Sequence, residues 1–381
     1  MSEKTTPIAK RAAQVAAFTV GGGVALAFAL SGSASADTIT SQDANVTNAG
    51  VGVANSGGNV AVGNASQNTA GCAQGAVGFI ANNSCDASNS SDGTANITTG
   101  TATAVGNEST TGVSQSASDP GTGGGLVVTD QDADVTNAGV GVGNSGLNAA
   151  VGNGSQNTAG CLQGAVGVVA NNSCDASNDS NGHASIKTGD ATGIGNQSTT
   201  GISQNASGGD GAGLAVVVQD ADVANLGLGV ANSGGNLALG NVSHNLAGCG
   251  QLALGFIANN SCDASNHSDG TASIVTGNAT GIGNKSTTGI HQGADVDPAG
   301  LAVIVQSAPV LKAGVGLANS GLNFGLGNGS LNNEILLQVS FGLLANNVGS
   351  ADNWSNGFTF IGTGTATGTG NDSSTWIDQT V

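Results

Sequence analysis

Residues 219–241 read Gln-Asp-Ala-Asp-Val-Ala-Asn-Leu-Gly-Leu-Gly-Val-Ala-Asn-Ser-Gly-Gly-Asn-Leu-Ala-Leu-Gly-Asn. Aliphatic residues occupy every second position from Leu226 to Val230 and again from Leu237 to Leu239, with glycine or alanine between them. A period of two is that of a β-strand, so one face of each strand is aliphatic and the other is nearly bare of side chains. A bare face allows a second backbone layer to approach closely.

This stretch belongs to a unit that occurs four times. Its opening triplet Gln219-Asp220-Ala221 matches Gln42-Asp43-Ala44, Gln131-Asp132-Ala133 and Gln306-Ser307-Ala308, at steps of 89, 88 and 87 residues. Internal repeats of this kind indicate a stacked architecture. The chain divides into a leader (1–36), three similar repeats (37–130, 131–218 and 219–305) and a divergent C-terminal repeat (306–381) that we expect to act as a cap or a docking unit.

Asparagines recur at matching positions of the four repeats. Three such sets are Asn55, Asn144, Asn232, Asn319; Asn64, Asn153, Asn241, Asn328; and Asn107, Asn196, Asn284, Asn371. Asparagine and glycine tolerate left-handed backbone angles, so these positions predict corners between strands of five to eight residues.

These features predict an all-β fold, a β-solenoid resembling a parallel β-helix and built from four repeats of about 88 residues. Stacked asparagine side chains would form ladders by hydrogen bonding to one another. With a turn of roughly 20–25 residues, the chain would make about 14–17 turns and a rod ~65–85 Å long. A bundle of antiparallel hairpins is the competing arrangement.

Composition excludes several protein classes. Of 381 residues, 66 are glycine, only 8% are charged and only 3% are aromatic. A globular enzyme with a deep core would need more large apolar side chains. Ordinary disorder would combine low hydrophobicity with high charge, whereas hydrophobic residues here reach 38%. Collagen is excluded, because glycine does not occur at every third position along the chain.

The first 36 residues resemble a secretion signal. Lys4, Lys10 and Arg11 precede an apolar run over 12–30, and Ala34-Ser35-Ala36 is a small-x-small cleavage pattern. An uncleaved membrane anchor is the alternative. Cleavage would leave three lysines and 23 acidic residues, a net charge of about −20. We therefore expect a secreted, extracellular or cell-surface protein that binds no nucleic acid and does not insert into a membrane after cleavage.

Six cysteines form one pair in each of the first three repeats: Cys72 and Cys85, Cys161 and Cys174, Cys249 and Cys262. The fourth repeat has Leu336 and Gly349 instead, and a joint loss is typical of bonded partners. We predict three disulfides within repeats. Bridges between repeats are not expected, because copies four turns apart would lie about 19 Å from one another. A zinc site is not expected either, because no repeating histidine accompanies the pairs.

Candidate residues for chemistry are few. The four histidines, His183, His244, His267 and His291, share no repeat position. We therefore predict no catalytic, cofactor-binding or metal-binding residue. The acidic pairs in 132–134 and 220–222 could attract calcium, but solvated surface charge is the simpler interpretation.

One threonine-rich stretch recurs once per repeat. In the first copy it reads Thr99-Gly100-Thr101-Ala102-Thr103. On a strand, threonines at every second position would lie on one face, as in one row of an ice-binding surface. Simple β-propensity accounts for the pattern equally well.

Two short segments resemble known families of secreted proteins. Ser56-Gly57-Gly58-Asn59-Val60-Ala61 resembles the core of curlin repeats, and the segment from Cys72 to Asn83-Ser84-Cys85 is similar to the chaplins of filamentous actinobacteria. The resemblance implies a secreted protein that assembles on a cell surface and has no enzymatic activity.

The favoured hypothesis is a secreted structural or cell-surface protein that forms a disulfide-stapled β-rod and self-assembles or joins the cell envelope. An ice-binding protein or an adhesin is the alternative, and a carbohydrate-active β-helix enzyme is a third hypothesis that rests on fold analogy. In the divergent repeat, the aromatic residues Trp354, Phe358, Phe360 and Trp376 are candidates for an assembly surface.

Overall fold

The computed structural model describes residues 38–119, 125–209, 212–298 and 300–381, and the predicted signal segment 1–36 lies outside these residues. The described residues form strands joined by short connections, and no helix among them is long and apolar enough to cross a membrane. The strands are β1 (Thr38–Asn55), β2 (Val60–Val77), β3 (Ile80–Thr98), β4 (Ala102–Asp119), β5 (Leu126–Asn144), β6 (Ala149–Val166), β7 (Val169–Lys187), β8 (Ala191–Gly208), β9 (Leu214–Asn232), β10 (Leu237–Leu254), β11 (Ile257–Val275), β12 (Ala279–Val296), β13 (Leu301–Ser307), β14 (Val310–Asn319), β15 (Phe324–Phe341), β16 (Leu344–Gly362) and β17 (Ala366–Thr380).

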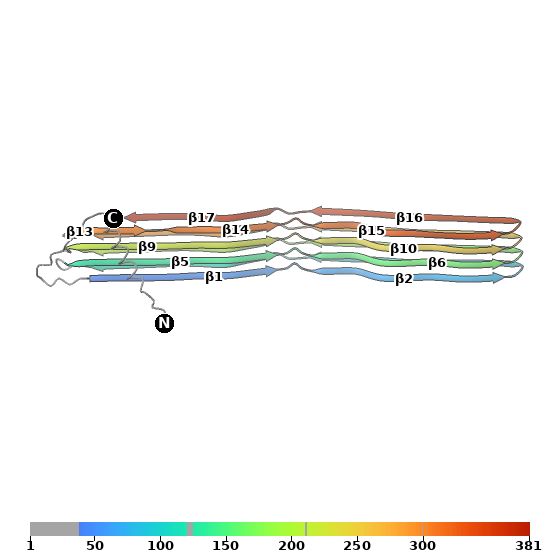
Figure 1. The fold of residues 1–381 in the computed structure, drawn as a ribbon, viewed down its shortest axis with the longest axis horizontal. Coiled ribbons are helices and arrows are strands. Elements are labelled where there is room, and N and C mark those ends of the chain that lie inside the picture. The colour runs from blue at the N-terminus through green and yellow to red at the C-terminus, as the bar shows by residue number, and fades with distance from the viewer. Residues whose placement is uncertain (1–37, 120–124, 210–211, 299) are drawn as a thin grey trace, which may run out of the picture.

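Each repeat forms one coil of a parallel β-solenoid. In coil one, β1 and β2 run end to end, the chain reverses, and β3 and β4 return (Figure 1). Coil two (β5–β8), coil three (β9–β12) and coil four (β13–β17) repeat this path, and each strand pairs in parallel with its counterpart in the next coil. The predicted all-β solenoid of four repeats is confirmed.

The coils stack into four sheets, one for each strand position. Sheet A holds β1, β5, β9, β13 and β14; sheet B holds β2, β6, β10 and β15; sheet C holds β3, β7, β11 and β16; sheet D holds β4, β8, β12 and β17. Sheet A faces sheet D and sheet B faces sheet C. The molecule is thus a flat, two-layered plank (Figure 1).

The predicted turn length was wrong, and so were the predicted dimensions. One coil takes a whole repeat, because strands 87 to 89 residues apart are hydrogen-bonded neighbours. Two 18-residue strands in line span ~120 Å, whereas four stacked coils span only ~19 Å. The long axis therefore runs along the strands, not along the stack.

Most of the asparagines expected at corners lie inside strands. Asn64 and Asn107 belong to β2 and β4, and their side chains point between the layers. Each follows a glycine that has no partner in the strand register, and the equivalent Gly152 and Asn153 are both buried. Two consecutive inward residues shift the alternation of inward and outward side chains by one position without ending the strand. Strands consequently reach 18–19 residues instead of five to eight.

Sheets A and B are separated in each coil by a short loop, residues 56–59 in coil one, which we call the corner although the strands on its two sides stay in line (Figure 1). Its third residue has a positive φ in all four copies: Gly58 (77°), Leu147 (61°), Gly235 (75°) and Leu322 (57°). Leucine in this left-handed region costs roughly 1–2 kcal/mol relative to an ordinary backbone conformation.

The interior between the layers is narrow and built from small residues. A Cβ atom added to Gly50 of β1 would lie 1.9 Å from the carbonyl oxygen of Gly106 on the opposite sheet. Alanine, valine, isoleucine and cystine fill the wider parts, with Ala133, Ala176 and Ile274 fully buried. The bare strand face in the sequence therefore does bring two backbone layers together.

Candidate functional site

The interior of the plank contains continuous ladders of amide side chains. Asn153 is fully buried, accepts a hydrogen bond from Asn64 Nδ2 (2.9 Å) and donates to Asn241 Oδ1 (3.0 Å) and Ser155 Oγ (3.1 Å). The structure places all twelve asparagines singled out in the sequence in three hydrogen-bonded columns. Those of Asn64 and Asn107 lie between the layers, whereas that of Asn55 lies at outward positions at the end of sheet A. Successive side chains are 2.6–3.0 Å apart in the columns of Asn55, Asn144, Asn232, Asn319; Asn64, Asn153, Asn241, Asn328; and Asn107, Asn196, Asn284, Asn371.

Sequence reasoning missed three glutamine ladders of the same kind. Their successive Nε2–Oε1 distances are 2.7–3.3 Å along Gln42, Gln131, Gln219, Gln306; Gln74, Gln163, Gln251, Gln338; and Gln115, Gln204, Gln292, Gln379. The signal that could have found them is glutamine at the same position in every repeat. Ladders that satisfy each buried amide make this polar interior compatible with a stable fold.

The six cysteines lie in one buried cluster of the plank. The structure contains the bridges Cys72–Cys85, Cys161–Cys174 and Cys249–Cys262, with Cα–Cα distances of 6.2–6.3 Å. The expected distance of about 19 Å between cysteines of successive repeats was wrong. Neighbouring repeats are one strand spacing apart, and Cys174 Sγ lies 3.0 Å from Cys249 Sγ. Disulfide-bonded sulfurs are not thiolates, so the cluster holds no metal in this state. The bridges indicate an oxidising compartment.

The histidines lie on the surface without a shared position. His267 Nε2 is 3.0 Å from Asp269 Oδ2, and its ring packs edge-on against Trp354 at 4.0 Å between centroids. His291 Nδ1 is 3.2 Å from Asp378 Oδ2. The side chains of both pairs are about two-fifths exposed, so water screens them. These are surface side-chain pairs, one between residues two apart on β11 and one between adjacent coils.

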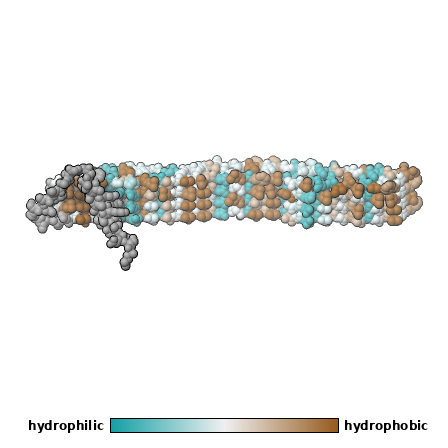
Figure 2. All heavy atoms as spheres, in the orientation of Figure 1, coloured by the Kyte–Doolittle hydropathy of each residue, from teal (hydrophilic) through white to brown (hydrophobic). Residues whose placement is uncertain are grey.

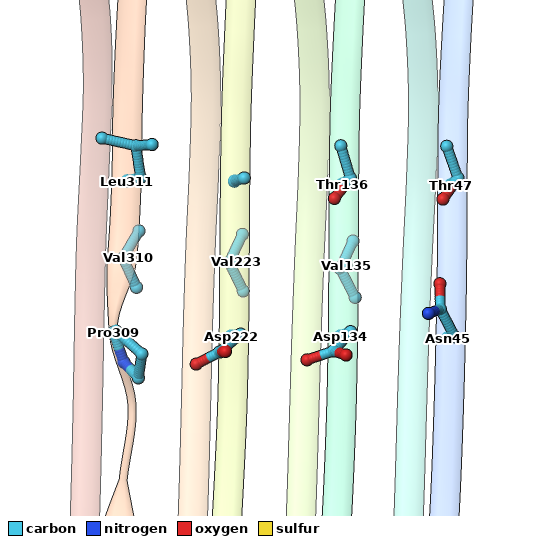
Figure 3. Close-up of a pocket in the computed structure, with 11 residues that line it drawn as sticks. Asn45, Thr47, Asp134, Val135, Thr136, Asp222, Val223, Pro309, Val310 and Leu311 are labelled. Carbon is cyan, nitrogen blue, oxygen red and sulfur yellow. The ribbon is translucent and has the colours of Figure 1, made fainter. Parts of the chain in front are cut away.

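Aspartates stack in columns on the outer surface. Asp43, Asp132 and Asp220 are register partners on sheet A, and Asp134 and Asp222 lie beside each other in the next column, where they line a shallow groove of about 580 Å³ (Figure 3). Asp132 is only 9% exposed, so its carboxyl group is covered by neighbouring residues. The expectation that this aspartate is a solvated surface charge was wrong.

A third acidic column crosses sheet C at Asp86, Asp175 and Asp263. Burial raises the pKa of the Asp175 carboxyl, and repulsion from the stacked carboxylates of Asp263 and Asp86 raises that pKa further. Like charges directly opposite each other destabilise a sheet. The column of Asp86, Asp175 and Asp263 is therefore a local cost to the folded state at neutral pH.

In its middle third, the outer surface of sheets A and B is apolar on both sides of the outward column of Asn55, Asn144, Asn232 and Asn319. Outward-pointing residues flank the corner in five columns, which cross the coils as brown stripes in Figure 2. We call this set the apolar face. Its members are Ala49, Ala138, Leu226, Ala313; Val51, Val140, Leu228, Val315; Val53, Val142, Val230, Leu317; Val60, Ala149, Leu237, Phe324; and Val62, Val151, Leu239, Leu326.

The apolar face is exposed across all four coils. Val51 and Val60 of coil one are each 75% exposed, Leu228 of coil three is 36% exposed, and Phe324 of coil four is 57% exposed. A shallow groove of about 360 Å³ runs across coils two to four between its first two columns. The sequence shows this pattern as aliphatic alternation, but only the layering reveals which alternate residues are outside.

The opposite surface, on sheets C and D, is mainly polar. Opposite the apolar face it carries the columns of Thr98, Thr101 and Thr103. Lys187 stands in the first of these columns, and Asp190 and Asn278 stand in the second. The threonine stretch does not lie on one face. Thr99 is buried and donates to the Ser145 carbonyl oxygen (3.0 Å), because residues 99–101 form the corner between β3 and β4.

The four aromatic residues singled out in coil four belong to this second surface. Trp354, Phe358 and Phe360 alternate along β16 and point outward, while Trp376 lies on β17. They are 49–61% exposed. The structure groups the first three on one strand and places Trp376 on another.

No protein-family model matches the chain, and neither curated protein sequences nor solved structures gave a match.

Proposed function

We propose that this chain is a non-enzymatic structural protein that is secreted and serves at the cell surface as a rigid, disulfide-stapled β-plank. The observation that supports this proposal most strongly is the repetition of the same amide columns through all four coils. A repeated interior fixes shape, whereas a catalytic centre needs one asymmetric cluster of reactive groups.

The interior is suited to a rigid structural element. Buried amides in the middle of the stack, such as Asn153 and Asn196, are hydrogen-bonded to ladder partners in the coils above and below, and the two backbone layers are in contact at the glycine columns. Three disulfides tie the layers of coils one to three together, each with a sequence separation of 13 residues. Such a fold resists local opening, because one strand can leave only if the ladders on both sides break.

Coil four supports a capping role for the C-terminal repeat. Lys312 takes the place of an inward asparagine in the column of Asn48, Asn137 and Asn225, and it donates to the Ser374 carbonyl oxygen. Glu334 takes the place of the buried Ala247. Burial lowers the pKa of Lys312 and raises the pKa of Glu334. Inward-pointing charges on an edge strand discourage further strand pairing.

Cell fractionation of the natural host tests the proposed location. The chain should be found outside the membrane or in the cell envelope, beginning near Asp37, with all six cysteines oxidised. Recovery of the reduced chain from the cytoplasm, with residues 1–36 still attached, would contradict the proposal.

One observation favours an ice-binding or adhesive role as a second candidate. Thr103, Thr192, Thr280 and Thr367 form an unbroken column on the outer surface of sheet D. Thermal hysteresis with faceted ice crystals, lost on Thr192→Val and Thr280→Val substitution, would support ice binding. Their absence would leave the structural role.

A further inference from the structure

We propose that two copies of this chain associate through their apolar faces, with the planks antiparallel and the corners between sheets A and B opposite each other. The inference rests on the proposed structural role and deepens it, because it names the partner that a building element needs. It can fail while that role stands, since a plank can be secreted and structural without pairing in this way.

The size of the apolar face matches that of a stable protein interface. Together with the asparagine column of Asn55 that crosses it, it extends over residues 49–62 of coil one and their equivalents in the other coils, which is ~45 Å along the strands and ~19 Å across the stack. That is ~850 Å² on each copy, or ~1,700 Å² in a pair, close to the standard interface of about 1,600 Å².

Backbone strain at the centre of the face points to the same contact. Leu147 and Leu322 stand at corner positions where the other two coils have glycine, and both are held at positive φ. Their side chains are 60% and 85% exposed, so burial within the plank does not explain the choice of leucine. The Leu147 side chain lies over Gly235 of coil three, where an added Cβ would meet its Cδ2 at 2.8 Å. Strain that a glycine would relieve, kept to expose an apolar side chain, indicates a binding role.

Charge selects the antiparallel arrangement. The columns of Asp43 and of Asn45 cross sheet A near one end of the plank, and together they contain Asp132, Asp220, Asp134 and Asp222. If two faces met in parallel, these carboxylates would oppose their own equivalents, and like charges across an interface are strongly unfavourable.

Reversing one copy about the stacking axis removes this conflict. The aspartate columns, about 14 residues before the corner, then face the region about 14 residues after it, near Gly71 and its equivalents Gly160, Gly248 and Ile335. The columns on the two sides of the corner exchange places, so Leu228 of one copy faces Leu239 and Val242 of the other. The contact is isologous and closes as a dimer.

Association through strand edges is the main competing mode. Beyond coil four, a second copy would have to extend columns that end in Lys312 and Glu334, whose charged side chains point inward. Pro309 also interrupts the strand edge of coil four. It has no N–H to donate to a further strand, and it lies in the break between β13 and β14. These features favour a contact through the face over a head-to-tail fibre.

The test compares two lysine substitutions in the full, oxidised chain. Leu228→Lys changes the apolar face, and Val275→Lys is its matched control on sheet C, with similar exposure (36% and 39%) and a natural lysine, Lys187, beside it in the same column. Sedimentation equilibrium should show dimers for the natural chain and for Val275→Lys. We expect the dissociation constant of Leu228→Lys to rise at least about ten-fold, because an unpaired charge would be buried.

Leu147→Gly separates association from folding. Glycine relieves the corner strain, so resistance to denaturant should be kept or increased while the dimer weakens. A photo-crosslinking amino acid at position 228 reports orientation: antiparallel pairing gives links to residues 239–242 of another copy, which lie ~35–45 Å away within one chain.

Three results would overturn the inference. They are a monomeric natural chain at micromolar concentration, equal effects of the two lysine substitutions, and covalent dimers in which position 228 is crosslinked to residues 138–142, which parallel pairing would place opposite it. If the chain is a monomer that adsorbs to lipid vesicles or to the air–water interface, the apolar face binds such an interface and not a second copy. Open-ended oligomers unaffected by Leu228→Lys would assign assembly to the strand edges. Neither result would contradict a structural role.

Discussion

Replacing Gly139 by alanine would place a methyl group where the backbone of the opposite sheet already lies. Gly139 belongs to β5 in the middle of sheet A, and its added Cβ would be 1.9 Å from the Gly195 carbonyl oxygen and 2.6 Å from the Asn107 backbone nitrogen. Ordinary contact begins near 3.4 Å, so the layers would have to separate by about 1.5 Å. The obstacle is backbone on both sides, and each strand is tied to its neighbours in register.

The expected cost is at the upper end of the range for overpacked interiors. Inserting a methylene into a filled core costs ~1–3 kcal/mol where side chains can adjust, and here no side chain can move aside. We therefore expect Gly139→Ala to lower the free energy of unfolding by about 3 kcal/mol or more. Guanidinium denaturation with intact disulfides, followed by far-ultraviolet circular dichroism, measures the change.

Gly201→Ala is the matched control for this experiment. Gly201 lies on β8 and is exposed, and an added Cβ there meets no atom within 4 Å. Its substitution should be neutral or stabilise by up to about 1 kcal/mol, because alanine loses less backbone entropy on folding. Equal midpoints for the two variants would show that the layers are not in backbone contact, and the narrow interior described above would be wrong.

Three further predictions concern the ladders, the acidic columns and the cap. Asn153→Ala should destabilise the fold by ~1–3 kcal/mol, because Asn64 and Asn241 lose a buried partner; the more exposed Asn171→Ala should cost less in the same denaturation assay. Asp175→Asn should raise stability at neutral pH. Because the folded-state pKa is raised, the folded chain binds the proton more tightly; the penalty is present above that pKa, and the gain from the substitution should vanish on acidification below the ordinary carboxyl pKa. A gain independent of pH would contradict this reasoning. Lys312→Asn with Glu334→Ala should remove the inward charges of coil four and permit head-to-tail fibres, detectable by light scattering; an unchanged particle size would show that these charges do not limit stacking.

Much of the fold could be predicted from residues 219–241 and their three copies. Alternation of Leu226, Leu228 and Val230 with small residues predicted strands with a bare inner face, and the equal spacing of the repeats predicted stacking. Turn length could not be obtained in this way. Asparagine favours corners and amide ladders alike, and Asn64 resembles a corner residue until its partner Asn153 is placed beside it.

The candidate surface could be predicted only in part. Aromatic residues such as Trp354 and Phe358 attract attention in a sequence with few of them, whereas Val51 or Leu228 resembles any strand residue. Their exposure depends on which side of sheet A faces sheet D. The strain at Leu147 was equally hidden, because a leucine after Ser145-Gly146 gives no sign of its backbone angle.

The sequence by itself determined the stacking, because identical residues at equal spacing can satisfy one another only when each copy lies on the next. It also determined the pairing of the cysteines, since partners within a unit are lost together, as in the fourth repeat. Only the tertiary structure decided the direction of the long axis and the two-sided character of the plank. Both depend on where the chain reverses, and that position is fixed by contact between distant layers, such as Gly50 against Gly106, and not by local backbone preference.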